Sequence, residues 1–149
     1  MTIVRQSVHI NAPIERVWEF WVVGANAPKW HPAVRSARRL SGTANQKDSV
    51  MEYEVEAGGR RFRWITEVAE MVAPRRFVDV QREGPFKSYR FVGELSPEES
   101  GTRADLTVEY RLPYGLLGRI VDATRVRRDV EESTRKSVEN LRRILESRA

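Results

Sequence analysis

The stretch LLGRIVDATRVRRDVEESTRKSVENLRRILESR, residues 116–148, predicts a long helix around which the rest of the chain is organised. Its apolar and small residues recur in steps of three and four, which places them on one stripe of an α-helix. These residues are Leu116, Ile120, Ala123, Thr124, Val130, Thr134, Val138, Leu141 and Leu145. Because an apolar stripe must be buried against another element, the remaining chain is expected to supply a surface for it.

That surface is predicted to be a single antiparallel sheet. In residues 49–56, Met51, Tyr53 and Val55 alternate with glutamates, which is the period of a strand with one buried face. Gly58 and Gly59 supply the positive φ angles of a tight hairpin turn after it. Similar alternation, bounded by turn residues, predicts the other strands at residues 2–10, 34–40, 61–68, 76–83, 88–95 and 102–112.

Two short helices are expected between the first and second strands. Asn11 is placed to cap the first helix, which carries Pro13 in its first turn and Trp18 on its apolar face, and Gly24 ends it. A second helical turn is expected over residues 25–30. The proline after His31 then returns the backbone to an extended conformation.

Composition narrows the classes of function. The 149 residues suit one domain, residues 1–149, with one core. No cysteine is present and the two histidines lack metal-binding spacing, so no disulfide, metal or other cofactor is expected. The net charge of +5 comes from 26 basic residues mixed with 21 acidic ones, which favours a solvated surface over a nucleic-acid-binding face. No segment is apolar enough for membrane insertion, and a cytoplasmic protein is expected.

Several short motifs resemble those of the START-like superfamily, also called Bet v 1-like or SRPBCC, in its polyketide cyclase/dehydrase and lipid-transport branch. They are Ile10-Asn-Ala-Pro13, Val17-Trp18, Trp30-His31-Pro32-Ala-Val34, Gly101-Thr102 and Pro113-Tyr-Gly115. The resemblance implies an α+β helix-grip fold: a seven-stranded curved antiparallel sheet around a long C-terminal helix, with two short helices after strand 1. It also implies an apolar cavity between sheet and C-terminal helix, and no shared catalytic residue.

The residues expected to line this cavity are mainly aromatic. Periodicity alone fits a packed core equally well, and the resemblance is what favours a pocket. The candidates are Trp21, Trp30, Met51, Tyr53, Phe62, Trp64, Val80, Arg82, Tyr89, Phe91, Tyr110, Ile120 and Thr124.

Some candidates carry polar groups. Arg82 is in phase with Val80, so it is expected either to point inward towards an anionic head group or to curl out to water. His31 lies where the cavity mouth is expected, as an acid/base group or as a structural histidine. Thr134 and Ser137 lie near the helix's apolar stripe, where they either face a wet cavity or reach solvent at its edge.

The leading hypothesis is binding or transport of a small hydrophobic ligand, such as a lipid, polyketide or aromatic molecule, by a monomer or weak homodimer. The alternative is a cyclase, aromatase or dehydratase using the same cavity, with Tyr53, Tyr110, Arg82 and His31 as the groups that move protons. A third possibility, a protein-interaction module like the superfamily's chaperone activators, has no supporting feature in the sequence. No catalytic residue is assigned.

Overall fold

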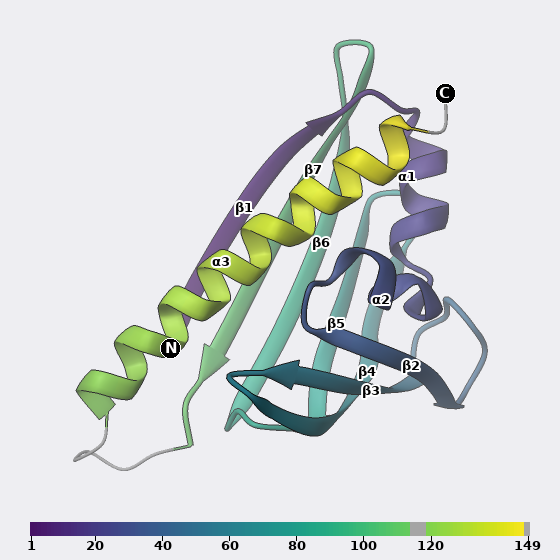
Figure 1. Ribbon diagram of the computed structural model, residues 1–149. Coiled ribbons are helices and arrows are strands. Elements are labelled where there is room, and N and C mark those ends of the chain that lie inside the picture. The colour runs from purple at the N-terminus through teal and green to yellow at the C-terminus, as the bar shows by residue number, and fades with distance from the viewer. Residues whose placement is uncertain (114–118, 148–149) are drawn as a thin grey trace.

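A computed structural model of the protein describes residues 1–113 and 119–147 and contains one seven-stranded antiparallel sheet (Figure 1). The strand order is β1-β7-β6-β5-β4-β3-β2, so every neighbouring pair except β1 and β7 is also consecutive in the chain. The strands are β1 (Thr2–Ile10), β2 (Val34–Ser41), β3 (Val50–Ala57), β4 (Arg60–Val72), β5 (Arg76–Glu83), β6 (Ser88–Glu98) and β7 (Gly101–Arg111). The predicted meander is confirmed.

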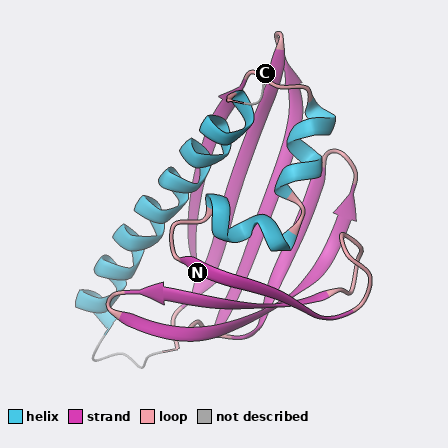
Figure 2. Ribbon diagram, turned by 45° about the vertical axis from the view of Figure 1, so that its right-hand side comes forward, coloured by secondary structure: helices cyan, strands magenta, loops and turns pink. Residues whose placement is uncertain are grey.

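The helices lie together on the concave face of this sheet (Figure 2). They are α1 (Ile14–Trp21), the 3-10 turn η1 (Gly24–Asn26), α2 (Ala27–Trp30) and α3 (Arg119–Glu146). The helix-grip fold expected from the sequence is therefore confirmed, although residues 116–118 and 148 of the expected long helix lie outside the described residues. None of the helices in the described part of the chain is long and apolar enough to cross a bilayer.

Helix α3 lies along β1 rather than across the centre of the sheet (Figure 1). Val138, Leu141 and Leu145 are its fully buried apolar residues. The buried Thr134 and Ser137 hydroxyls donate hydrogen bonds of 3.0 and 2.8 Å to backbone carbonyls one turn earlier. These polar groups are therefore satisfied by the helix itself, and no wet cavity is needed to explain them.

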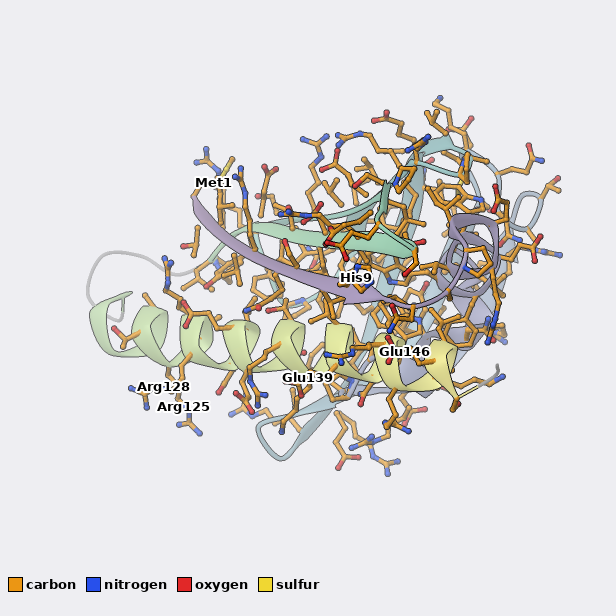
Figure 3. All side chains as sticks on the ribbon, turned by 90° about the horizontal axis from the view of Figure 1, so that it is seen from above. Met1, His9, Arg125, Arg128, Glu139 and Glu146 are labelled. Atoms are coloured by element: carbon orange, nitrogen blue, oxygen red, sulfur yellow. The ribbon has the colours of Figure 1, made fainter. Side chains whose placement is uncertain are left out.

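On the outer face of α3, ion pairs join side chains that lie one helical turn apart. Arg135 contacts Glu139 at 2.9 Å, and Arg142 contacts Glu146 at 3.5 Å. Arg125 and Arg128 point away from the sheet near the other end of the helix (Figure 3). Exposed pairs of this kind contribute only about 0.3–0.5 kcal/mol each, so burial of the inner stripe dominates the docking of the helix.

The sheet bends strongly where β4 leaves β5 and turns towards β3. The pairing register between β4 and β5 shifts between Ile65 and Thr66 and again between Val68 and Glu70. The pairing of β2 with β3 contains two further shifts. Because bulges increase local twist and bend a strand, β2 and β3 curl over the concave face (Figure 2).

One corner of the molecule joins the segment after β1 to the start of β7 and to the end of α3. The Thr102 hydroxyl, which is fully buried, donates a 2.8 Å hydrogen bond to the Ala12 carbonyl. The backbone N–H of Asn11 donates to a Glu146 carboxylate oxygen at 2.9 Å. The expectation that Asn11 caps α1 is wrong: Pro13 occupies that position, with no side-chain capping bond.

Gly101 allows this corner to close. A Cβ atom at this position would lie 2.3 Å from the Ile10 carbonyl oxygen and 3.2 Å from the Asn11 Cα. Both atoms belong to the backbone, so neither moves aside by a change of rotamer. Only glycine therefore permits the end of β1 to pair with the start of β7 at this distance.

We predict that Gly101→Ala lowers the free energy of unfolding by about 1–3 kcal/mol, because the added methyl group forces β1 away from β7. Urea denaturation should show a lower midpoint with an unchanged slope. The matched control is Ser100→Ala, one residue earlier in the exposed turn, where a change below about 0.5 kcal/mol is expected. Equal midpoints for the two variants would contradict the role assigned to Gly101.

Candidate functional site

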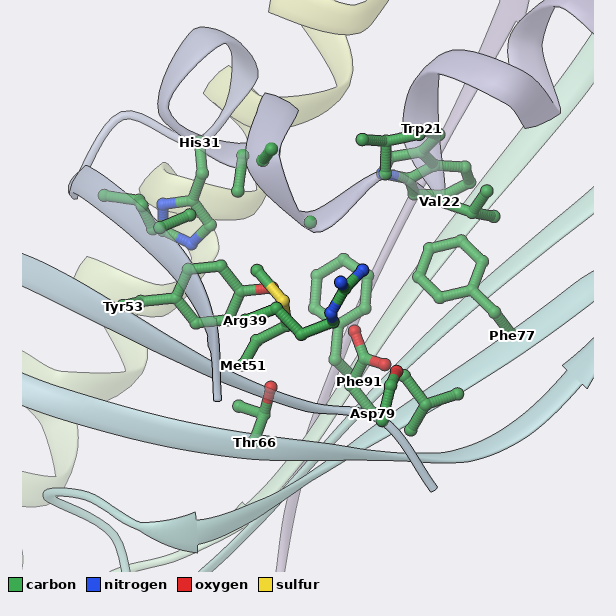
Figure 4. Close-up of a pocket in the computed structure, with 18 of the residues that line it drawn as sticks. Trp21, Val22, His31, Arg39, Met51, Tyr53, Thr66, Phe77, Asp79 and Phe91 are labelled. Carbon is green, nitrogen blue, oxygen red and sulfur yellow. The ribbon is translucent and has the colours of Figure 1, made fainter. Parts of the chain in front are cut away.

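A cavity of about 190 Å³ lies between the concave sheet and the short helices (Figure 4). Strands β3, β4, β5 and β6 form its floor, while the end of α1, η1, α2 and β2 surround it. None of the described residues of α3 lines it. The expectation of a cavity between sheet and C-terminal helix is therefore corrected: the cavity lies beside α3, under the short helices.

Seven of the residues predicted from the sequence line this cavity. Their aromatic rings pack edge to face around it, with centroids 4.5 Å apart for Trp64 and Tyr89 and 6.4 Å apart for Trp21 and Trp30. Such geometry is the favoured one for aromatic pairs. The seven residues are Trp21, Trp30, Met51, Tyr53, Trp64, Tyr89 and Phe91.

Three other candidates lie away from the cavity, and a fourth cannot be placed because its side chain is outside the described residues. Phe62 contacts the ring of Trp64, with 6.2 Å between centroids, but does not reach the cavity. Tyr110 is 1% exposed in the core and packs on Phe86 at 5.0 Å. Thr124 is exposed on α3, and the side chain of Ile120 lies outside the described residues. The helix therefore contributes none of its predicted ligand contacts among the described side chains.

The prediction of which face of β5 points into the cavity was wrong. Val80 and Arg82 lie on the outer face, and Arg82 is 55% exposed and pairs with Glu67 at 3.3 Å. Val78 shares that face, paired with Val92, and is buried there. The residues that reach the cavity from β5 are instead Phe77 and Asp79.

Sequence reasoning missed Asp79 because both faces of β5 carry apolar residues. The strand reads Phe77-Val78-Asp79-Val80, so alternation fits either phase, and a charged residue is normally assigned to solvent. On the outer face Val78 is buried because Arg76, bonded to Glu70 at 3.2 Å and to Glu94 at 3.0 Å, lies beside it, whereas Val80 is only half-buried. Long charged side chains can cover apolar surface in this way.

Asp79 is the acidic group of the cavity. Its cross-strand neighbours are Val68 and Phe91, and it forms no ion pair or hydrogen bond with any described residue. Burial raises the pKa of its carboxyl group to about 7, because the ionised form loses water without gaining a charged partner. At neutral pH the carboxyl group is therefore divided between its two forms.

His31 is held as a neutral hydrogen-bond donor. The backbone N–H of Ala33 donates a 3.1 Å hydrogen bond to Nδ1 of His31, so the ring proton belongs on Nε2. Burial lowers the pKa of the imidazole to about 4. His31 therefore offers an N–H group to the cavity at neutral pH rather than a positive charge.

The tyrosine hydroxyl groups of the cavity wall are also neutral donors. Burial raises the pKa of the Tyr53 and Tyr89 hydroxyl groups, so both stay protonated. The indole N–H groups of Trp21, Trp30 and Trp64 are buried, and no described residue accepts a hydrogen bond from them. Because these indole N–H groups are enclosed by protein, the further donors left to the cavity wall are the hydroxyl groups of Tyr53 and Tyr89, beside the acid Asp79.

The cavity opens beside the loop between β2 and β3, where Ala44 and Asn45 are exposed. Arg39 lies at this mouth and points towards Asp79 (Figure 4), although the two form no ion pair. In η1, a Cβ on Gly24 would lie 2.7 Å from Cε of Met51 and 3.1 Å from the Tyr53 hydroxyl oxygen. The roof thus rests directly on these two side chains.

Within the described residues, no group of three or more histidine, aspartate or glutamate side chains is arranged to hold a metal ion. The aromatic lining suits apolar molecules, the tyrosine hydroxyl groups can hydrogen-bond to them, and the Asp79 carboxyl group can exchange a proton.

The curved sheet and the long terminal helix give the chain the helix-grip fold of START-like, SRPBCC proteins. The chain belongs to the polyketide cyclase / dehydrase and lipid transport family, whose model matches residues 1–146. The resemblance predicted from the sequence motifs is confirmed. No curated protein matches the chain.

Solved structures share this fold at low sequence identity. The protein TTHA0849 of Thermus thermophilus is 23% identical, with a TM-score of 0.85 and 99% of each chain covered. A START superfamily protein of Mycobacterium smegmatis is 19% identical, with a TM-score of 0.67 over 98% of this chain and 95% of that one. The di-domain ARO/CYC protein BexL of the BE-7585A biosynthetic pathway is 17% identical, with a TM-score of 0.72. That match covers 96% of this chain and 46% of BexL.

We predict that Asp79→Asn stabilises the protein at pH 8 by roughly 1–3 kcal/mol. Folding raises the pKa of this carboxyl group from 3.8 to about 7, so its ionised form destabilises the fold. The ionised Asp79 carboxylate destabilises the wild type fully above pH 7 and not at all below pH 3.8. The extra stability of the Asp79→Asn variant should therefore shrink as the pH falls from 7 to 3.8. Urea denaturation of both proteins from pH 4 to pH 8 measures it.

Asp129→Asn serves as the control, because Asp129 is exposed on α3. Its effect on stability should stay within about 0.5 kcal/mol at every pH. If Asp79→Asn stabilises the protein equally at every pH, the ionised Asp79 carboxylate is not what destabilises the wild type.

Proposed function

We propose that the protein binds a small, largely apolar molecule in the cavity beneath α1, η1 and α2. The observation that carries the proposal is the cavity itself: about 190 Å³ of space walled by aromatic side chains that pack on one another rather than filling it. Membership of the polyketide cyclase / dehydrase and lipid transport family supports the same function.

The volume favours a compact ligand. An apolar cavity of ~150 Å³ holds one benzene molecule, and this cavity is somewhat larger and opens to solvent beside Asn45. The ligand we propose is therefore a single aromatic ring or a short acyl chain, with any larger portion projecting through the mouth.

Ala37 is the most direct position for testing this site. It lies on β2, lines the cavity and pairs with Tyr53, while the adjacent Ser36 is exposed on the other face. We predict that Ala37→Phe fills the cavity and weakens toluene binding at least tenfold, as followed by NMR of the Met51 methyl group. Aromatic residues are favoured in strands, so the fold should be retained.

The matched control is Ser36→Phe, which adds the same side chain one residue away and outside the cavity. It should bind toluene as the wild type does. Equal binding by the Ala37→Phe variant, or no binding of toluene by the wild type, would argue against the proposed site.

The natural ligand is sought by native mass spectrometry of the purified protein, followed by denaturing extraction. A co-purifying hydrophobic molecule that is absent from the Ala37→Phe variant would identify the ligand class. Equal amounts in both proteins would place that molecule outside the cavity.

A second candidate function is catalysis on a polyketide-like substrate, and Asp79 favours it. A carboxyl group with a pKa near 7 can both take up and release a proton at neutral pH. Of the four proton-transfer residues suggested by the sequence, His31 and Tyr53 line the cavity, whereas Arg82 and Tyr110 do not. The catalytic set on this proposal is therefore Asp79, His31 and Tyr53.

For this second function we predict that the protein cyclises a linear poly-β-ketone: a methylene carbon loses a proton and bonds to a carbonyl carbon, the new alkoxide is protonated, and the β-hydroxyketone then loses water. Asp79→Asn should slow the reaction by ~100-fold or more. Mass spectrometry of the products measures the loss of water. Turnover that is unchanged in Asp79→Asn would remove Asp79 from the mechanism, and the absence of turnover by the wild type would leave ligand binding as the function.

A further inference from the structure

Asp79 is a half-buried acidic residue, and no described neighbouring residue pairs with its carboxyl group. It lies on the floor of the cavity, paired across the sheet with Val68 and Phe91, and no described residue gives it an ion pair or a hydrogen bond. Its oxygen atoms are not among the buried polar atoms that lack both solvent contact and a partner. They therefore face the space that a ligand would occupy.

A carboxylate in such surroundings is stabilised by a donor that brings positive charge. Removing an ion from water without a partner costs several kcal/mol, and a hydrogen-bonded counter-ion recovers much of this. Aromatic faces add to the effect, because their negative quadrupole attracts cations within about 6 Å of the ring. Aromatic rings that line the cavity include those of Trp21, Trp64, Phe77 and Phe91.

We propose that the cavity selects a small organic amine: an ammonium group that binds the Asp79 carboxylate, attached to an aromatic or short apolar body that fills the rest of the cavity. This inference rests on the proposed binding function and adds the chemical class of the ligand. It also explains why a charged side chain occupies an otherwise aromatic floor.

The other titratable groups that face Asp79 leave this role open to a ligand. His31 at the end of α2, Tyr53 on β3 and Tyr89 on β6 are neutral near pH 7. The residues that line the cavity from α1 and β4 carry no titratable group. The remaining charge is that of Arg39 on β2, which lies at the exposed mouth and does not pair with Asp79.

The proposal makes amine binding depend on pH. With a pKa of about 7, the carboxyl group is roughly 10% ionised at pH 6 and 90% ionised at pH 8. An amine that stays protonated over this range should therefore bind about tenfold more tightly at pH 8. At pH 6 its binding should release nearly one proton, because the ammonium group lowers the pKa of Asp79.

The experiment compares three ligands of nearly equal shape by isothermal titration calorimetry at pH 6 and pH 8: benzylamine, benzyl alcohol and benzoate. Benzylamine should bind at least tenfold more tightly than the other two at pH 8. Titrations at pH 6 in two buffers of different ionisation enthalpy measure the released proton.

Three variants test whether Asp79 causes the preference for benzylamine. In Asp79→Asn, the ratio of benzylamine to benzyl alcohol affinity should fall towards one and the proton release should disappear. Asp129→Asn, which removes an exposed acidic group from α3, should keep both. Replacing the mouth residue by Arg39→Gln should raise benzylamine affinity, because a like charge is removed from the entrance.

The outcomes separate the two proposals. If benzyl alcohol binds as well as benzylamine, or if benzoate binds best, the amine inference is overturned while the apolar binding function stands. If Asp79→Asn keeps the preference for benzylamine, Asp79 is not the recognition group and the inference fails. If the wild type binds none of the three ligands, both proposals fail.

Discussion

The architecture depends on the contact between the Ile10 carbonyl group and Gly101. These residues end β1 and begin β7, and their approach is possible only where no side chain stands between them. The same corner anchors the end of α3, because the Arg16 guanidinium donates to the Leu145 carbonyl oxygen at 2.6 Å. With the helix end fixed there, α3 runs along β1 and leaves β3, β4 and β5 to be covered by the short helices.

This placement explains how much could be predicted from the sequence. Strands such as β3 carry apolar residues on one face only, so their extent and orientation follow from alternation. Strand β5 has valines on its outer face, beside the stems of charged side chains. The face of β5 that points into the cavity was therefore assigned incorrectly. The cavity's position depends on bulges in β2 and β4 and on where α3 docks, and neither follows from local periodicity.

The polar groups of the cavity form a coherent electrostatic arrangement. His31, Tyr53 and Tyr89 are kept in their neutral, donating forms by burial, while Asp79 is held near the point of half ionisation. Such an arrangement is costly for an empty protein, since buried polar groups without partners weaken the fold. Natural proteins commonly retain such costs where a ligand or a reaction requires them.

The roof of the cavity determines how far the shape of the chamber can adapt. Gly24 touches Met51 and Tyr53 without a side chain of its own, so the height of the chamber is set by the flexible thioether below it. An unbranched methionine changes shape by bond rotation, which lets one chamber accept molecules of different outline. A larger residue at position 24, or a branched one at position 51, would therefore change the shape of the chamber at its roof, at a distance from the corner that anchors α3.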